Sequence, residues 1–299
     1  MSRCPPAAAA ASQPDGVGSV AIVGTGQVGT MVGLALRASP GGRRAADVAL
    51  LDRDPSALEA GLRLGAGDRA LTDVAAALQA DTVVLALPVP EIVRFLREHG
   101  ASMRPGSLVL DTGSAKGVVV SAMRECLPPG VHAIGGHPMA GTEGTGPAAA
   151  RPELLHDAAF VLTPVREDAT ALERARSFVR ATGARPVEMD AASHDATVAR
   201  TSHLPHVTAF AVVAAAGRAA TEPWFAPGVA ATGYRSATRL ASSDPELVAS
   251  FLCANGAEVA AVVAEVRDWL SRFEVELGST PERLAKFLAE ARTAAARVA

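Results

Sequence analysis

The 299-residue sequence has few cysteines, few aromatic residues and no long uninterrupted hydrophobic run. Its cysteines, Cys4, Cys126 and Cys253, lie far apart and form no CxxC pair, which excludes a disulfide framework or zinc ribbon and favours the reducing cytoplasm. Aromatic residues make up 4% of the chain, too few for a surface that stacks nucleic-acid bases. The longest apolar runs, such as 207–216, fall well short of the about 20 residues that cross a membrane. We therefore expect neither nucleic acid nor a membrane as a partner.

Charge is also scarce. Charged residues make up 20% and the formal net charge is −3, so a basic surface that follows phosphates is not expected. Hydrophobic residues make up 49%, which excludes a disordered or fibrous chain. The alanine- and proline-rich stretch 1–18 makes a poor signal peptide and is predicted to be a disordered leader.

From residue 19 onward, short apolar or β-branched runs alternate with amphipathic stretches. Examples of the runs are 19–23, 82–87 and 107–111, each followed by a segment with helical periodicity. Strands separated by helices imply βαβ crossovers and a mostly parallel sheet that is covered on both faces. We predict a doubly wound, Rossmann-like α/β domain over 19–189.

The rest of the chain, 190–299, is rich in Ala, Val and Leu and indicates long helices without a strand. Segments 207–216 and 257–266 are so apolar that about 110 residues can hardly bury all their faces alone. We predict an all-helical domain for substrate binding and dimerisation, with these faces covered by a second copy. A well-packed monomeric bundle is the alternative.

A glycine-rich turn joins the first predicted strand to the first predicted helix. It has the pattern GxGxxG, and Asp52 ends the next strand 23 residues after Gly29. This layout is typical of dinucleotide binding, with the pyrophosphate at the helix N-terminus and the carboxylate on the ribose hydroxyls. The carboxylate favours NAD over NADP, although Arg53 could tolerate a phosphate. The predicted cofactor-binding residues are Gly24, Thr25, Gly26, Gln27, Val28, Gly29, Asp52, Arg53 and Pro88.

Two polar residues follow predicted strands at the edge where ligands of such sheets bind. His137 ends the run 131–138, and Ser114 follows the strand that ends near Asp111. A histidine there can act as an acid or base, although a lone histidine is more often structural. Ser114 can equally cap the helix that follows it.

The helical part opens with His194, His203 and His206, the last two on one face with Pro205 between them. No carboxylate or cysteine completes a metal site, so we expect no metal and interpret the histidines as a polar pocket wall. Arg235 and Arg239 are four residues apart and suit a substrate with carboxylates, or form a solvated helix face.

Together these motifs resemble the prephenate and arogenate dehydrogenase family of tyrosine biosynthesis. GTGQVG with Asp52 is similar to its NAD site, DTGSAK (111–116) to its serine motif, and GGHPMAGTE (135–143) to its most diagnostic segment. SHDATVARTSHLPH (193–206) and GYRSATRLASSDP (233–245) resemble two motifs of its helical domain. The five motifs occur in order between residue 19 and about residue 276.

The resemblance implies a role for each matching residue. The family's catalytic histidine falls on His137 and its supporting hydroxyl on Ser114. Arg239 matches the arginine that holds a substrate carboxylate, and Glu143 matches a gating acid at the pocket rim. The substrate-binding residues implied are Arg239, His206, His203, His194, Glu143 and Arg235. No regulatory or mutase domain, and no feedback by tyrosine through one, is expected.

The reaction implied is NAD-dependent oxidative decarboxylation of prephenate to 4-hydroxyphenylpyruvate, with His137 as the base. Arogenate and 4-amino-4-deoxyprephenate are alternative substrates. A dehydrogenase of β-hydroxy acids is a further alternative, but the lysine that such enzymes use in their helical domain is missing, because Lys286 lies in the last stretch. The alternative of another class is a non-catalytic NAD-binding sensor.

Overall fold

The computed structural model describes residues 17–38 and 47–295. All but the last two residues of the predicted leader, 1–18, lie outside the described residues. The chain divides into two compact units. The first comprises 1–194 and 242–254, and the second comprises 195–241 and 255–299. The chain passes from the first unit to the second within helix α7 (Ala191–Val198).

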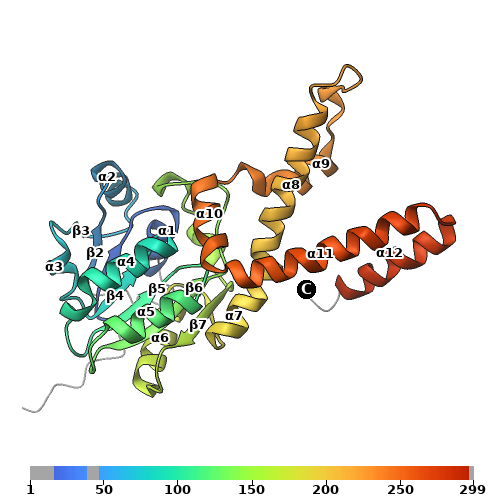
Figure 1. Cartoon of the computed structure of the whole chain (residues 1–299). Helices are drawn as coiled ribbons and strands as arrows, with labels where there is room; N and C mark the ends of the chain where they lie inside the picture. Colours follow the sequence, from blue (N-terminus) through green and yellow to red (C-terminus); the bar gives the residue numbers. More distant parts are fainter. Residues whose placement is uncertain (1–16, 39–46, 296–299) are drawn as a thin grey trace, which may run out of the picture. The chain divides into compact units, whose positions relative to one another are not determined.

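An eight-stranded sheet forms the centre of the first unit, in the order β3-β2-β1-β4-β5-β6-β7-β8 (Figure 1). All neighbouring strands are parallel except β6 and β7, which are antiparallel. The order 3-2-1-4-5-6 is that of dinucleotide-binding folds, and it reverses direction between β1 and β4. The strands are β1 (Ser19–Val23), β2 (Asp47–Leu51), β3 (Arg69–Ala70), β4 (Thr82–Leu85), β5 (Leu108–Asp111), β6 (His132–Pro138), β7 (Ala159–Pro164) and β8 (Arg185–Glu188).

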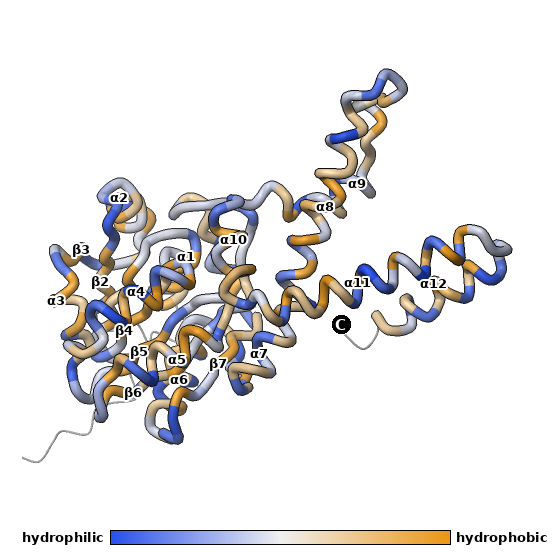
Figure 2. The backbone as a smooth tube through the Cα atoms, viewed as in Figure 1, coloured by the Kyte–Doolittle hydropathy of each residue, from blue (hydrophilic) through white to orange (hydrophobic). Residues whose placement is uncertain are grey.

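Helices cover both faces of this sheet because successive strand side chains point to opposite faces. In β1, Val20 and Ile22 belong to one buried cluster, whereas Ala21 and Val23 belong to another. The first cluster includes side chains of α1 (Gln27–Arg37) and α6 (Ala169–Ala181), and the second those of α4 (Val89–His99) and α5 (Gly117–Cys126). The central strands β1 (SVAIV) and β4 (TVVL) are accordingly mostly hydrophobic. Hydrophilic residues alternate with hydrophobic ones along the surrounding helices (Figure 2). The unit also contains α2 (Pro55–Arg63), α3 (Val74–Ala77) and α10 (Pro245–Ala254), which packs on α4.

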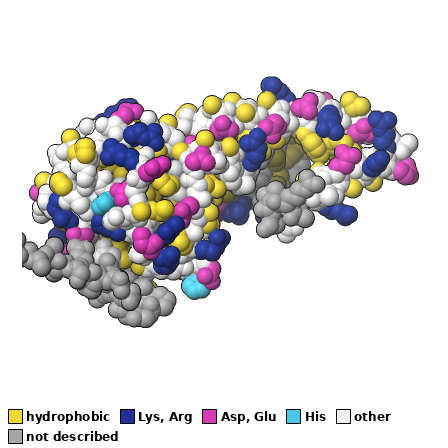
Figure 3. Space-filling view, turned by 90° about the horizontal axis from the view of Figure 1, so that it is seen from below, with side chains coloured by type: hydrophobic (Ala, Val, Ile, Leu, Met, Phe, Trp, Pro, Cys, Tyr) yellow, Lys and Arg dark blue, Asp and Glu magenta, His cyan; other side chains and the backbone are white. Residues whose placement is uncertain are grey.

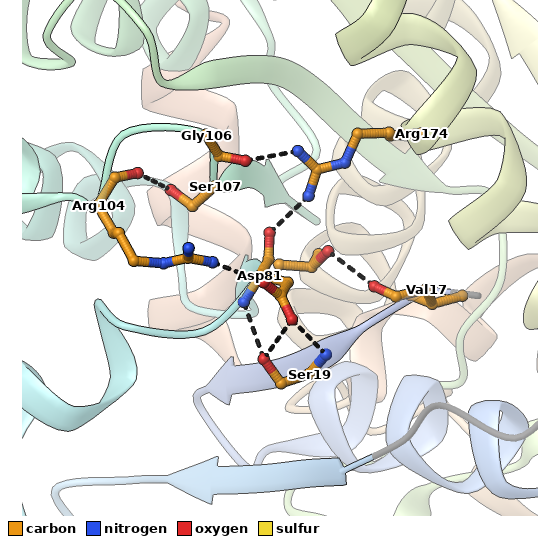
Figure 4. A network of polar contacts seen from close by, with 8 residues as sticks. Val17, Ser19, Asp81, Arg104, Gly106, Ser107 and Arg174 are labelled. Carbon is orange, nitrogen blue, oxygen red and sulfur yellow. Dashed lines mark hydrogen bonds and ion pairs between the residues drawn. The ribbon is translucent and has the colours of Figure 1, made fainter. Parts of the chain in front are cut away.

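Asp81, just before β4, ties together the amino-terminal ends of several strands (Figure 4). Its Oδ2 accepts hydrogen bonds from the Ser19 amide at 3.0 Å and the Ser19 hydroxyl at 2.8 Å, and its Oδ1 accepts one from Arg104 at 2.6 Å. Arg174 donates to the main-chain oxygen of Asp81 at 2.7 Å. The Ser19 amide, more than any other contact, holds the pKa of Asp81 below its ordinary value, against the effect of burial. This end of the sheet is therefore fastened by polar contacts that involve no predicted site residue.

The second unit contains helices and no strand among its described residues. A π-helical turn (Ala199–His203) leads into α8 (Leu204–Ala219), and α9 (Thr232–Thr238), α11 (Gly256–Leu277) and α12 (Pro281–Ala295) follow. The interruption predicted around Pro205 occurs as this π-helical turn. Pro205 itself is the second residue of α8, and the main chain is already helical at His203 and Leu204 before it. The predicted fold class, a Rossmann-like α/β domain followed by an all-helical region, is confirmed.

Apolar side chains are exposed along these helices. Val275 is 69% exposed, Leu277 59% and Leu270 51%, and Figure 3 shows such side chains among acidic and basic ones on α11 and α12. In the part of the chain that the structure describes, no single helix is long and apolar enough to cross a membrane. The consecutive helices α10 and α11, which are bent by 97° where they meet, are together long and apolar enough, by length and composition alone.

Candidate active site

The glycine loop has the geometry that a dinucleotide requires. Gly24 has a φ of +99°, which favours glycine, and a Cβ on Gly29 would lie 1.9 Å from the Gly24 carbonyl oxygen. Gly29 therefore permits the close contact between α1 and the end of β1. A Cβ on Gly26 would meet nothing within 4 Å, so the space above this residue is open for a ligand.

The N-terminus of α1 lies at the same point. Gly26 is its N-cap, no side chain caps its first amides, and no acidic residue lies in its first turn. Such a helix end attracts an anion through its free N–H groups and its dipole. The open space and the uncapped amides thus fit a pyrophosphate.

A pocket of about 500 Å³ adjoins the loop and contains Asp52, whose position agrees with the predicted ribose contact. Its Oδ2 accepts from the Thr25 amide at 2.6 Å and the Thr25 hydroxyl at 2.9 Å, and its Oδ1 accepts from the Asp54 amide at 2.9 Å. A carboxylate has about four acceptor positions, so Asp52 can accept one more hydrogen bond. Thr25 acts here by holding Asp52. Gly24, Gly26, Arg53 and Pro88 also line the pocket.

Two further charged residues, Glu91 and Arg94, line this pocket and were not predicted from the sequence. Glu91 forms an ion pair with Arg94 and lies 3.8 Å from Arg53. Both arginines, which could otherwise attract a second phosphate, therefore face a carboxylate. With Asp52 in the same pocket, this arrangement favours NAD over NADP. No sequence motif marks Glu91, because its partners come from two separate segments.

The side chain of Gln27, predicted to bind the cofactor, contacts the loop that follows His137. Its Nε2 donates to the Thr142 hydroxyl at 2.5 Å and to the Gly144 carbonyl at 3.0 Å, and its Oε1 accepts from the Thr142 amide at 3.2 Å. The half-buried Glu143 lies between these two anchors. The glycine loop and the loop of the predicted gating acid are thus joined.

His137 lies near the carboxyl end of β6 and is 9% exposed. Its Nδ1 is 2.8 Å from Nε2 of His194, which is fully buried, and the two rings meet edge to face. One of these two nitrogens donates a hydrogen and the other accepts it. His194, predicted to bind substrate, therefore orients the ring of His137.

Ser114 is half-buried in the turn between β5 and α5. It does not cap α5, because the N-cap residue is Lys116 and no side chain caps this helix. The interpretation of Ser114 as a helix cap was therefore wrong. Asp111 and Lys116 flank the turn and contact Gly136, next to His137. Both residues belong to the DTGSAK motif, and no role was predicted for either from the sequence.

His203 and His206 lie in the second unit and have different hydrogen-bond partners. Nδ2 of Asn255 donates to the Asp195 carbonyl at 2.8 Å and lies 3.2 Å from Nδ1 of His203. Because Nδ2 donates, Nδ1 of His203 accepts, and the ring hydrogen resides on Nε2 when this ring is neutral. Nδ1 of His206 lies 3.0 Å from the Ser202 carbonyl, which only accepts, so this Nδ1 carries a hydrogen. The two neutral rings thus differ at Nε2, which is a donor in His203 and an acceptor in His206.

The two predicted arginines do not share one α-helix. Arg235 lies in α9 and donates to the Ala230 carbonyl at 3.2 Å, whereas Arg239 begins the 3₁₀ turn Arg239–Ser242. Both side chains are exposed. Within residues 17–38 and 47–295, no group of three or more His, Cys, Asp or Glu is arranged to hold a metal ion.

Comparisons with known proteins agree with this geometry. The chain matches the prephenate dehydrogenase nucleotide-binding domain over residues 32–188 and the prephenate dehydrogenase dimerization domain over residues 190–290. The first match begins within α1, so the assignment of the glycine loop depends on its own geometry.

Individual relatives point the same way. The chain is 32% identical over 240 residues to the prephenate dehydrogenase of Bacillus subtilis, a match that covers 79% of this chain and 64% of that protein's length. It is 31% identical to the cyclohexadienyl dehydrogenase of Zymomonas mobilis, over 76% of this chain and 78% of the relative. The crystal structure of the A. aeolicus prephenate dehydrogenase in complex with hydroxyphenyl propionate and NAD⁺ superposes with a TM-score of 0.82 at 26% identity, covering 94% of this chain and 98% of that one.

The nucleotide-binding domain match and the fit of the glycine loop confirm the predicted cofactor, NAD. The resemblance to this family is likewise confirmed, because the two domain matches together extend from residue 32 to residue 290 and contain the four motifs that follow the glycine loop. This chain belongs to the prephenate dehydrogenase family.

Proposed function

We propose that the protein catalyses the NAD-dependent oxidative decarboxylation of prephenate to 4-hydroxyphenylpyruvate. NAD, when bound, accepts a hydride from the ring carbon that carries the hydroxyl group. Carbon dioxide leaves from the quaternary ring carbon and the ring becomes aromatic, which drives the reaction forward. Gly26 and the amides at the start of α1 would hold the pyrophosphate, and Asp52 the ribose.

The hydrogen bond between His137 and His194 is the observation that carries this proposal. When Nδ1 of His137 donates to Nε2 of His194, Nε2 of a neutral His137 keeps its lone pair. That nitrogen can accept the hydroxyl proton as carbonyl character develops, a role that accelerates such reactions by about 10²- to 10⁴-fold. Ser114 would orient the hydroxyl or the imidazole.

We infer a role for each of the residues proposed to bind the substrate. Arg239 would hold a carboxylate, because a guanidinium binds carboxylates through two parallel hydrogen bonds. His203, with its hydrogen on Nε2, can donate to a further oxygen. We also propose His206, Glu143 and Arg235 as substrate-binding residues, with Glu143 on the loop anchored by Gln27.

The active form would be a homodimer. The match of residues 190–290 to a dimerization domain supports this proposal, as do the exposed apolar side chains of α11 and α12. A second copy covering these side chains would remove apolar surface from water.

The test is the formation of NADH with prephenate, arogenate and 4-amino-4-deoxyprephenate, each with NAD and with NADP. We expect the largest kcat/KM with prephenate and NAD. A larger value with either amino compound would replace the substrate but keep the reaction type. If no compound is turned over although NAD binds tightly, the protein is an NAD-binding sensor and the proposed activity is wrong.

A further inference from the structure

Gly136, the residue before His137, pairs with Leu162 of β7, but side chains take the place of strand pairing on its β5 side. The pairing between β5 and β6 ends at Leu110 and Ile134. Two positions farther on, the Gly136 amide donates to Oδ1 of Asp111 at 2.9 Å, and the Gly136 carbonyl accepts from Nζ of Lys116 at 2.7 Å. Both main-chain groups of Gly136 are thus bound by side chains where the pairing between β5 and β6 has stopped.

The two side chains also bind each other. Oδ2 of Asp111 accepts from Nζ of Lys116 and, at 2.7 Å, from the Gly113 amide. Both side chains are fully buried, where charges are costly unless they are paired and hydrogen-bonded. Asp111 binds three donors and Lys116 two acceptors, so the pair meets this requirement. We call the pair the Asp111–Lys116 clamp.

The glycines before His137 make room for the clamp. A Cβ on Gly136 would lie 2.4 Å from the Asp111 carbonyl oxygen, and one on Gly135 would lie 3.3 Å from Cδ of Lys116. A larger residue at position 136 would push β6 away from β5. Gly136 thus permits the close approach of β6 to the end of β5, and Gly135 leaves room for the side chains of Val120 and Lys116.

We propose that Asp111 and Lys116 are positioning residues for His137. The clamp fixes the main chain on one side of this residue, and His194 fixes its ring at Nδ1. Through the Gly113 amide, the clamp also fixes the turn that carries Ser114. It therefore sets the imidazole and the hydroxyl relative to each other. This inference rests on the proposed function, in which His137 is the base.

Removing the charges distinguishes a positioning role of the clamp from a purely structural one, because the two roles predict different values of kcat when the Tm is restored. Lys116→Met leaves the Asp111 carboxylate buried without its cation and should lower the Tm strongly. The double variant Asp111→Asn/Lys116→Met removes both charges and should recover most of this loss. If the pair only stabilises the fold, the double variant should then recover the wild-type kcat as well.

The experiment compares both variants with the wild type and with Arg104→Met, which breaks the partly exposed ion pair at the other end of the sheet. The readouts are the Tm, kcat and KM with prephenate, and the pH titration of the His137 Cε1–H resonance, which His137→Asn identifies. For the double variant we expect a Tm near the wild-type value, a kcat about 10- to 100-fold lower and a shifted His137 resonance. Arg104→Met should lower only the Tm.

Several results would overturn the positioning role. One is a double variant with wild-type kcat and an unshifted His137 resonance. Another is a double variant that fails to fold, since the pair would then be structural. If the wild-type protein turns over none of the substrates, the proposed function fails. The resonance of His137 still tests the clamp in that case, because it needs no substrate.

Discussion

The two ends of the central sheet are fastened by charged side chains in different ways. At the amino ends of the strands, Asp81 and Arg104 are 30% and 37% exposed, whereas at the carboxyl ends Asp111 and Lys116 are fully buried. A partly exposed ion pair is screened by water and contributes little by itself. A buried pair is tolerated only with complete hydrogen bonding, and it then holds its neighbours in one geometry. The comparison indicates that Asp81 stabilises the amino end mainly through its hydrogen bonds with Ser19, whereas the buried pair fixes the geometry of the carboxyl end.

The largest effect is expected at the carboxyl end. His137→Asn should lower kcat with prephenate by about 10²- to 10⁴-fold, because an amide cannot accept the hydroxyl proton. The Tm should stay within a few degrees of the wild-type value, since asparagine can occupy part of the same space. NADH absorbance and thermal unfolding measure the two quantities. Near wild-type turnover would remove the base from the mechanism.

A substitution at the amino end of the strands should instead lower the stability and leave kcat unchanged. Asp81→Asn weakens the contacts with Ser19 and Arg104 and should lower the free energy of unfolding by about 1–3 kcal/mol. Its kcat should equal that of the wild type. Urea titration and the turnover assay test this pair of expectations, and a loss of kcat at unchanged stability would erase the contrast between the two ends.

The fold should also lose stability at acid pH, because carboxylates at the amino ends of the strands become protonated. The hydrogen bond from the Ser19 amide is the largest influence on the pKa of Asp81, which it lowers. In Asp168, burial raises the pKa, but the hydrogen bonds from the Ala171 amide and His132 together bring it below its ordinary value. Both groups therefore stabilise the fold fully above their unfolded pKa of about 3.9, and this stability is lost as the pH falls through the lower folded values. The Tm should decrease below about pH 4. A decrease equally steep in Asp81→Asn would show that Asp81 is not involved.

The smallest effect concerns the nucleotide pocket. Glu91→Gln frees Arg53 and Arg94 from a carboxylate, so NADP should bind about two- to fivefold more tightly, while the affinity for NAD changes little. Titration calorimetry with both nucleotides measures this change. Asp52→Ala is the matched variant and should weaken NAD binding. If Glu91→Gln binds NADP with unchanged affinity, Asp52 alone discriminates between NAD and NADP.

Features encoded by a local pattern could be predicted from the sequence. The glycine loop, the strands that end near Asp111 and His137, and the helical second part follow from turn residues and periodicity. The small strand β3 was not predicted, since its two residues are exposed and show no alternation.

Contacts between distant segments could not be predicted in the same way. The clamp joins residues 20 and 25 positions apart, and Gln27 contacts a residue 115 positions away. One signal was present, because Lys116 is one of two lysines in a chain that otherwise uses arginine. A compact ammonium fits a buried site that a planar guanidinium does not, so this lysine could have indicated a special environment.

The most direct test of the account is the pH dependence of kcat/KM for the wild-type enzyme with prephenate and saturating NAD. If neutral His137 accepts the proton, kcat/KM should fall at acid pH as one imidazole becomes protonated, and the residual activity of His137→Asn should lack this fall. A wild-type profile that stays flat through the range in which histidine titrates would contradict the assignment of His137 as the base.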